Sequence, residues 1–171
     1  MYVNIWLRKT LKTTCLILFV GIFSAQTSQA KETGSFTGTW SANGELESLA
    51  FGNNREIALY KLTGHVNLTS NIGRTSDYWS QCFGLAETQL GGVTHCVWRG
   101  RDGSEILITL SSESMNEGAT IKGQIVGGTG AAKGITGSLQ LEWKTLRILQ
   151  QNKTRSVGGY SRNLHGTYSL P

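Results

Sequence analysis

Cys82 and Cys96 are the pair whose residue type and spacing point most directly to chemistry. Neither belongs to a Cys-x-x-Cys pair, the spacing typical of zinc sites and thioredoxin-like redox sites. If the two cysteines face each other across an antiparallel hairpin, Phe83 pairs with His95 and residues 87–91 form the loop. We therefore predict a structural disulfide that closes a loop of about 15 residues.

The histidines and carboxylates do not form a recognisable catalytic set. His65 and His165 fall on the polar faces of alternating segments, where we expect solvated side chains. His95 lies among apolar residues in the proposed hairpin, where burial would lower its pKa; a hydrogen-bonded structural role is the alternative. No Ser-His-Asp or metal-ligand spacing is present, so we expect neither a metal nor a cofactor.

Aromatic side chains are the best candidates for ligand binding. Small-molecule pockets are mostly apolar and aromatic with a few polar anchors, and in a small barrel the same side chains can instead fill the interior completely. Both interpretations stay open. The ligand-binding candidates are Trp40, Tyr60, Trp79, His95, Trp98 and Trp143.

These residues lie on segments whose apolar positions alternate with period two, the pattern of strands with one buried face. Residues 58–68 are the clearest case, with an apolar or glycine residue at every even position. Turn-forming stretches rich in Gly, Asn and Asp separate the segments. The expected strands lie at about 36–42, 58–68, 78–86, 93–100, 106–110, 120–126, 135–143 and 160–170.

Eight short antiparallel strands predict an all-β fold, and we expect a small closed eight-stranded barrel of the calycin or allene oxide cyclase-like kind. Closure removes the exposed edges that an open sheet must protect. A two-sheet sandwich would give the same alternation and is the alternative. Residues 146–150 contain no glycine and could form a helical turn or a strand extension.

The glycine-rich segment 127–137 invites comparison with phosphate-binding loops. Its spacing matches neither the Gly-x-x-x-x-Gly-Lys-Ser/Thr nor the Gly-x-Gly-x-x-Gly pattern, and no helix is expected after it. We predict a glycine-rich β-hairpin with positive φ angles and bulges.

This hairpin resembles the late Gly-Gly-Thr-Gly hairpin of allene oxide cyclase-like and dirigent-like barrels. The wider pattern over residues 36–144 resembles a group of exported bacterial proteins of unknown function with that barrel. The resemblance implies the fold but no catalytic residue, because none of the plant enzymes' residues can be matched to a position here. The segments that carry it are Gly38-Thr39-Trp40, Phe51-Gly52, Cys96-Val97-Trp98, Gly123 to Gly130, Gly134 to Ser138 and Trp143. The first of them is also similar to the Gly-x-Trp opening of lipocalins and avidins.

Residues 1–30 read as a secretory signal peptide. Three basic residues at positions 8–12 precede an uncharged run at 15–25, too short to span a membrane, and a Ser28-Gln29-Ala30 cleavage sequence. We expect residues 31–171 to be a single barrel domain, periplasmic or extracellular, with no lasting membrane anchor. Export also favours the disulfide.

Removal of the predicted leader changes the charge balance. The whole chain has a net charge of +5, whereas residues 31–171 contain 13 basic and 11 acidic side chains, a net charge of +2. The basic residues are scattered, so we expect no nucleic-acid partner. The sequence indicates no oligomeric state.

Three functions stay open. The favoured one is binding of a small hydrophobic or aromatic molecule inside the barrel. A cyclase- or isomerase-like enzyme would need a polar cluster with His95 or a buried Glu at the cavity mouth. A structural or interaction protein would have a solid barrel.

Overall fold

The computed structural model describes residues 31–114, 119–151 and 154–171, and of residues 147–151 and 154 it describes the backbone. The predicted signal peptide at 1–30 lies outside these residues. Eight strands follow one another, with one short 3-10 helix, η1. They are β1 (Glu32–Ala50), β2 (Glu56–Ser70), β3 (Thr75–Glu87), β4 (Gly91–Gly100), β5 (Glu105–Ser112), β6 (Thr120–Gly128), η1 (Gly130–Ala132), β7 (Thr136–Gln151) and β8 (Thr154–Leu170).

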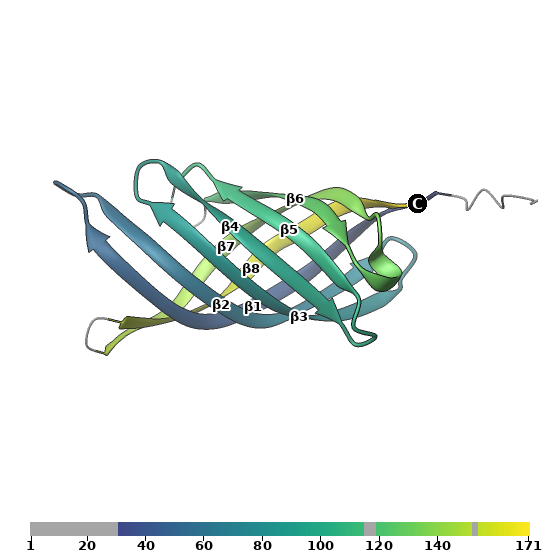
Figure 1. The fold of residues 1–171 in the computed structure, drawn as a ribbon, viewed down its shortest axis with the longest axis horizontal. Helices are drawn as coiled ribbons and strands as arrows, with labels where there is room; N and C mark the ends of the chain where they lie inside the picture. The colour runs from purple at the N-terminus through teal and green to yellow at the C-terminus, as the bar shows by residue number, and fades with distance from the viewer. Residues whose placement is uncertain (1–30, 115–118, 152–153) are drawn as a thin grey trace, which may run out of the picture.

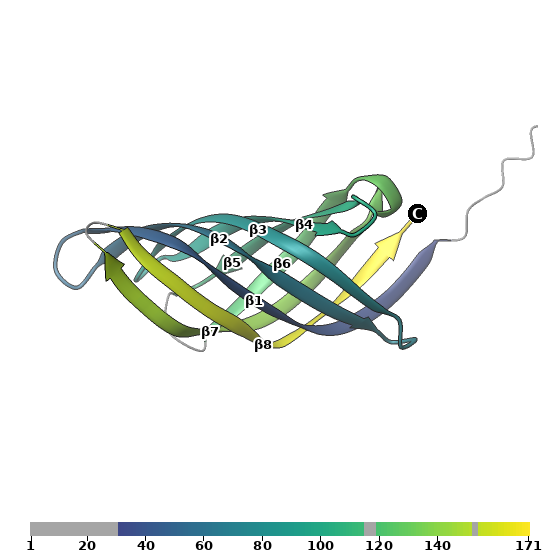
Figure 2. The ribbon, with the colours of Figure 1, turned by 90° about the horizontal axis from the view of Figure 1, so that it is seen from below.

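The strands form a closed antiparallel barrel in which each strand pairs with its neighbours in sequence. Closure comes from β1 and β8, which pair from Glu32 opposite Leu170 to Leu46 opposite Arg155. The two ends of the described chain therefore lie at the same end of the barrel (Figures 1 and 2). The predicted all-β barrel is confirmed, and the sandwich alternative is wrong. Within the described ranges, no helix is long and apolar enough to span a membrane.

Alternating side chains point into the barrel, as the period-two pattern predicts. In β2, the residues at even positions from Ala58 to Leu68 are buried or half-buried, and most of those between them are exposed. The middle of the interior is filled by side chains that are at most 2% exposed. These are Val66, Ser80, Cys82, Cys96, Ile108, Leu141 and Leu164.

The β3–β4 hairpin has the register that the cysteines predict. Cys82 pairs with Cys96 and forms the disulfide, and Phe83 pairs with His95. The predicted loop at 87–91 is too long, because Glu87 pairs with Gly91 and only residues 88–90 connect the strands.

A bulge in β8 shifts the pattern of inward-facing residues. The pairing of β7 with β8 changes register between Gln140 and Glu142, and Asn163 has a φ of 53°. Leu164 is buried on one side of this bulge and Ser161 on the other. Tyr160, expected on the same face as Leu164, therefore lies on the opposite face.

The glycine-rich segment forms the β6–β7 connection and contains η1, a short helix that the sequence analysis did not expect. Gly130 and Gly134 have φ angles of 57° and 81°, as predicted for this segment. The backbone of residues 146–151 extends β7 as a strand rather than forming a helical turn.

The barrel wall is uneven. β1, β2, β7 and β8 have 15 to 19 residues, whereas β3 to β6 have 8 to 13. At the end away from the termini, the β1–β2 and β7–β8 hairpins extend beyond the shorter strands (Figure 1). That end is therefore bounded by a taller wall on one side.

Candidate functional site: two cavities in the barrel

The interior has a cavity at each end of the filled middle. The distal cavity, about 200 Å³, lies at the end away from the termini. The terminal cavity, about 300 Å³, lies at the end where Glu32 and Leu170 pair. Of the residues that the structure describes, none lines both cavities. The barrel is thus solid in its centre and hollow at both ends.

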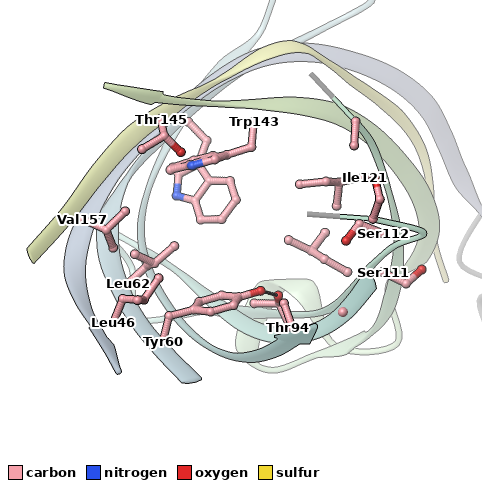
Figure 3. A pocket seen from close by; sticks show the side chains of 16 residues that line it. Leu46, Tyr60, Leu62, Thr94, Ser111, Ser112, Ile121, Trp143, Thr145 and Val157 are labelled. Carbon is pink, nitrogen blue, oxygen red and sulfur yellow. Dashed lines mark hydrogen bonds between the residues drawn. The ribbon is translucent and has the colours of Figure 1, made fainter. Parts of the chain in front are cut away.

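Aromatic rings form much of the distal cavity wall. Trp143 and Tyr60 lie on opposite sides of it (Figure 3), and Trp40 also lines it. The Trp40 and Trp143 rings are tilted against each other with centroids 5.0 Å apart. Leu62, Ile121 and Val157 are among its apolar lining residues.

Two hydrogen bonds fix Trp40 at the base of this cavity. Its Nε1–H donates to Ser80 Oγ at 2.8 Å, and its backbone N–H donates to Ser161 Oγ at 2.8 Å. Ser80 and Ser161 are buried polar residues whose hydroxyls are thereby satisfied. Ser80 of β3 thus holds the indole ring, and Ser161 of β8 holds the backbone that carries it.

Glycines make room for the other two rings. Gly84 is paired with Tyr60, and a Cβ on Gly84 would lie within 3 Å of ring atoms of Tyr60. A Cβ on Gly159 would meet the Trp143 ring in the same way. Both rings therefore lie flat on the barrel wall instead of filling the space in front of them.

The polar groups of the distal cavity are mainly hydroxyls. The Tyr60 hydroxyl and Thr94 Oγ1 lie 2.5 Å apart in a hydrogen bond (Figure 3). Burial raises the pKa of Tyr60, and the hydrogen bond with Thr94 opposes that shift. The phenol is therefore neutral at physiological pH and can act as donor or acceptor. Ser112 and Thr145 add further hydroxyls to the lining.

Glu87 is buried near the same end of the barrel but serves the β3–β4 turn. It forms an ion pair with Arg55 at 3.0 Å and accepts hydrogen bonds from the backbone N–H groups of Gln89 and Leu90. The hydrogen bond from Arg55 is the main reason that the pKa of Glu87 lies below its usual value. Its carboxylate is thus held by the turn and does not line the distal cavity.

The terminal cavity receives other aromatic residues. Trp98, Tyr78 and Phe36 line it, together with Tyr168 near the rim. The Tyr168 hydroxyl donates to Glu32 Oε1 at 3.0 Å. Of the candidates from the sequence, the structure therefore brings Trp40, Tyr60 and Trp143 together at one end and places Trp98 at the other.

Trp79 and His95 do not line either interior cavity. Trp79 is 47% exposed on the outer face, where its ring and the His65 ring pack nearly perpendicular with centroids 4.8 Å apart. His95 is also exposed, with Nδ1 3.3 Å from Thr109 Oγ1. The expected burial of His95 is wrong, because its cross-strand partner Phe83 also points outward.

Sequence analysis missed an apolar groove on this outer face. Leu59, Leu85 and Val93 pair across three neighbouring strands and line it with Phe83. All four are about half exposed. Their odd positions on β2, β3 and β4 could have shown it, since the inward residues of these strands are even-numbered.

The described residues contain no group of three or more His, Cys, Asp or Glu side chains placed to hold a metal ion. No protein-family model matches the chain. No curated protein matches it. Among solved structures, the chain is similar to the pterocarpan synthase dirigent protein GePTS1, with 15% sequence identity and a TM-score of 0.46. The similarity covers 82% of this chain and 87% of that chain.

Proposed function

We propose that this barrel binds a small, mostly apolar molecule in the distal cavity, and that the molecule carries one aromatic ring and one hydrogen-bonding group. The observation that supports this most directly is a cavity walled by Trp40, Tyr60 and Trp143 whose polar groups are mainly hydroxyls. Aromatic walls with few polar anchors are the usual composition of small-molecule sites.

The size of the cavity limits the ligand. An apolar protein cavity of about 150 Å³ accommodates benzene. The distal cavity, at about 200 Å³, therefore suits a single ring with a small substituent. Larger ligands would have to extend past the rim, along the inner face of the long β1–β2 and β7–β8 hairpins.

The hydroxyl pair sets the polarity of the ligand. The neutral phenol of Tyr60 and the Thr94 hydroxyl can together accept and donate one further hydrogen bond. A ligand hydroxyl or carbonyl can join this pair without a buried charge, whereas a carboxylate would be desolvated with no cation in the described lining. We therefore favour a neutral ligand.

The other two functions have less support. An isomerase of the kind considered above needs a carboxylate or His95 at the cavity mouth, and the described lining of the distal cavity contains neither. A solid barrel has no interior space, whereas this one has space at each end. The disulfide is consistent with an exported protein, and we propose that binding takes place in the periplasm or outside the cell.

The test is calorimetric titration with 4-ethylphenol and with ethylbenzene, which lacks the hydroxyl. We expect both to bind saturably, and we expect Tyr60→Phe to weaken 4-ethylphenol about fivefold, the usual effect of one hydrogen bond. Ethylbenzene should bind this variant unchanged.

Filling the cavity supplies the matched control. Ile121→Trp places a larger side chain in the lining and should abolish both interactions, while Val93→Trp adds the same side chain on the outer face and should abolish neither. Absence of saturable binding to the unmodified protein, or equal binding by both variants, would reject the proposal.

A further inference from the structure

The rim of the terminal cavity carries one acidic and one basic side chain. Glu32 and Arg74 are the charged residues in the described lining, and both are exposed. Neither forms an ion pair with another described residue. Two opposite charges therefore border the same opening without pairing with each other.

β1 and the β2–β3 turn bring these two side chains to one opening. Glu32 is the first residue of β1, and Arg74 is the last residue of the turn before β3. The backbone N–H of Asn71 in this turn donates to the Ser35 carbonyl oxygen at 2.9 Å, which ties the turn to β1. Burial raises the pKa of Tyr168, the hydrogen-bonded Glu32 carboxylate raises it further, and Arg74 lowers it. Both charges thus lie close enough to act on one phenol.

The buried part of the lining is apolar. The polar lining residues, Ser70 and Ser76 among them, are half-buried or exposed. The cavity is about 300 Å³, which is room for a phenyl ring, because an apolar cavity of about 150 Å³ accommodates benzene. It is therefore amphipathic, with apolar surface inside and polar groups toward solvent. The buried lining residues are Phe36, Trp98, Ile106, Ile125, Ala132 and Ile135.

We infer that the terminal cavity is a second binding site, for an apolar α-amino acid whose ammonium group pairs with Glu32 and whose carboxylate pairs with Arg74. The apolar side chain of this ligand occupies the buried part of the cavity. The site goes beyond the proposed function, because the described linings of the two cavities share no residue. The filled layer around Val66, the disulfide and Leu164 separates them.

A ligand with a single charge fits this rim less well than a zwitterion. A lone carboxylate gains the Arg74 guanidinium but meets the Glu32 carboxylate, and a lone ammonium group meets the reverse arrangement. A zwitterion can pair with both side chains. Glu32 can also accept a second hydrogen bond, because the Tyr168 hydroxyl donates to Oε1 and no described residue donates to Oε2.

The experiment is a ¹⁵N–¹H NMR titration with L-phenylalanine of the Ile121→Trp protein, in which the distal cavity is filled. Three matched probes each lack one part of this ligand: 3-phenylpropanoate lacks the ammonium group, 2-phenylethylamine lacks the carboxylate and glycine lacks the ring. Backbone signals of Ile72 and Tyr168 report on the terminal cavity, and that of Tyr60 reports on the distal one. Because the distal cavity is filled, failure here is distinguishable from failure of the proposed function.

We expect L-phenylalanine to shift the Ile72 and Tyr168 signals saturably. It should bind about threefold more tightly than either single-charge probe, the usual effect of one solvent-exposed ion pair. Glycine should give no saturable shift at the same concentrations, because it buries no apolar group. Absence of a saturable shift, shifts confined to Tyr60, or equal binding of L-phenylalanine and the single-charge probes would overturn the proposal.

Variants that remove one charge assign each end of the ligand. Glu32→Gln keeps an oxygen acceptor for the Tyr168 hydroxyl, and it should weaken L-phenylalanine about threefold without weakening 3-phenylpropanoate. Arg74→Gln should weaken L-phenylalanine and 3-phenylpropanoate but not 2-phenylethylamine. Glu47→Gln and Arg162→Gln are the matched controls, at exposed residues that line neither interior cavity, and should change none of these affinities. If Glu32→Gln or Arg74→Gln affects all three probes equally, the assignment is wrong.

A further variant tests the location of the site. Ala131 is an exposed residue of η1 that lines the terminal cavity, so Ala131→Trp adds a large side chain there without replacing a core residue. It should abolish the shifts that L-phenylalanine causes at Ile72 and Tyr168. Persistence of those shifts would place the ligand elsewhere and overturn the proposal.

Discussion

Four glycines of the barrel lie beneath aromatic rings on a neighbouring strand. In each case an added Cβ would lie within 3 Å of ring atoms. The missing side chain lets the ring lie against the backbone, which removes it from the centre of the barrel. The four combinations are Gly34 with Tyr168, Gly84 with Tyr60, Gly159 with Trp143 and Gly166 with Phe36. Glycines and aromatic rings thus act together: each glycine leaves room for a ring against the wall, and the ends of the barrel stay hollow.

Gly84→Ala tests this device in the distal cavity. The new methyl group forces Tyr60 away from the wall and into the cavity, so we expect weaker binding of 4-ethylphenol and a loss of about 1–3 kcal/mol in the free energy of unfolding. Calorimetry and urea denaturation measure the two effects. Gly127→Ala is the matched control, because no atom lies within 4 Å of its added Cβ. Equal behaviour of the two variants would contradict the argument.

The placement of single residues was only partly predictable from sequence. Residue type identified Trp40, Tyr60 and Trp143, and the structure gathers them at one end. Type alone could not exclude Trp79, although it is one position out of phase with Ser80 and Cys82, which point inward. Whether a side chain points into the barrel depends on its odd or even position along the strand, and residue type does not show this.

At the scale of elements, the β3–β4 hairpin is the part that the sequence determined best, because two cysteines fix its register. The strand ends were predicted too short, since pairing continues past the last buried residue where the barrel wall meets solvent. The bulge at Asn163 could not be predicted, because alternation on each side of it looks normal until the strand is paired. The alternation of residues predicts that β8 is a strand, but the register shift within it is visible only from its pairing with β7.

The disulfide links these two strands from inside the barrel, with Cys82 and Cys96 0% and 2% exposed. We expect reduction to lower the free energy of unfolding by about 3 kcal/mol, the chain-entropy value for a loop of about 15 residues. Urea denaturation with and without dithiothreitol measures the change. The Cys82→Ala/Cys96→Ala protein should show no response to the reductant. A midpoint in the unmodified protein that does not move on reduction would show that the disulfide does not stabilise the fold.

At the scale of the whole molecule, closure and filling are separate properties. β1 pairs with β8 to close the barrel, and eight strands leave an interior that large side chains nearly fill. Here small and medium-sized side chains fill the middle layer, and the largest rings lie at the two ends, where glycines let several of them lie against the wall. The sequence indicated a barrel, but whether its interior was hollow depended on ring orientation, which neither composition nor periodicity contains.

A filled middle layer makes the two cavities thermodynamically independent. A ligand at one hundred times its dissociation constant stabilises the folded state by about 2.7 kcal/mol. With 4-ethylphenol at that concentration, we expect the same increment in unfolding free energy in the unmodified protein and in Ala131→Trp, which adds a large side chain at an exposed residue that lines the terminal cavity. Urea denaturation with and without 4-ethylphenol measures this, and Ile121→Trp should remove the increment. Loss of the increment in Ala131→Trp would mean that the Val66 layer yields when the terminal end is filled.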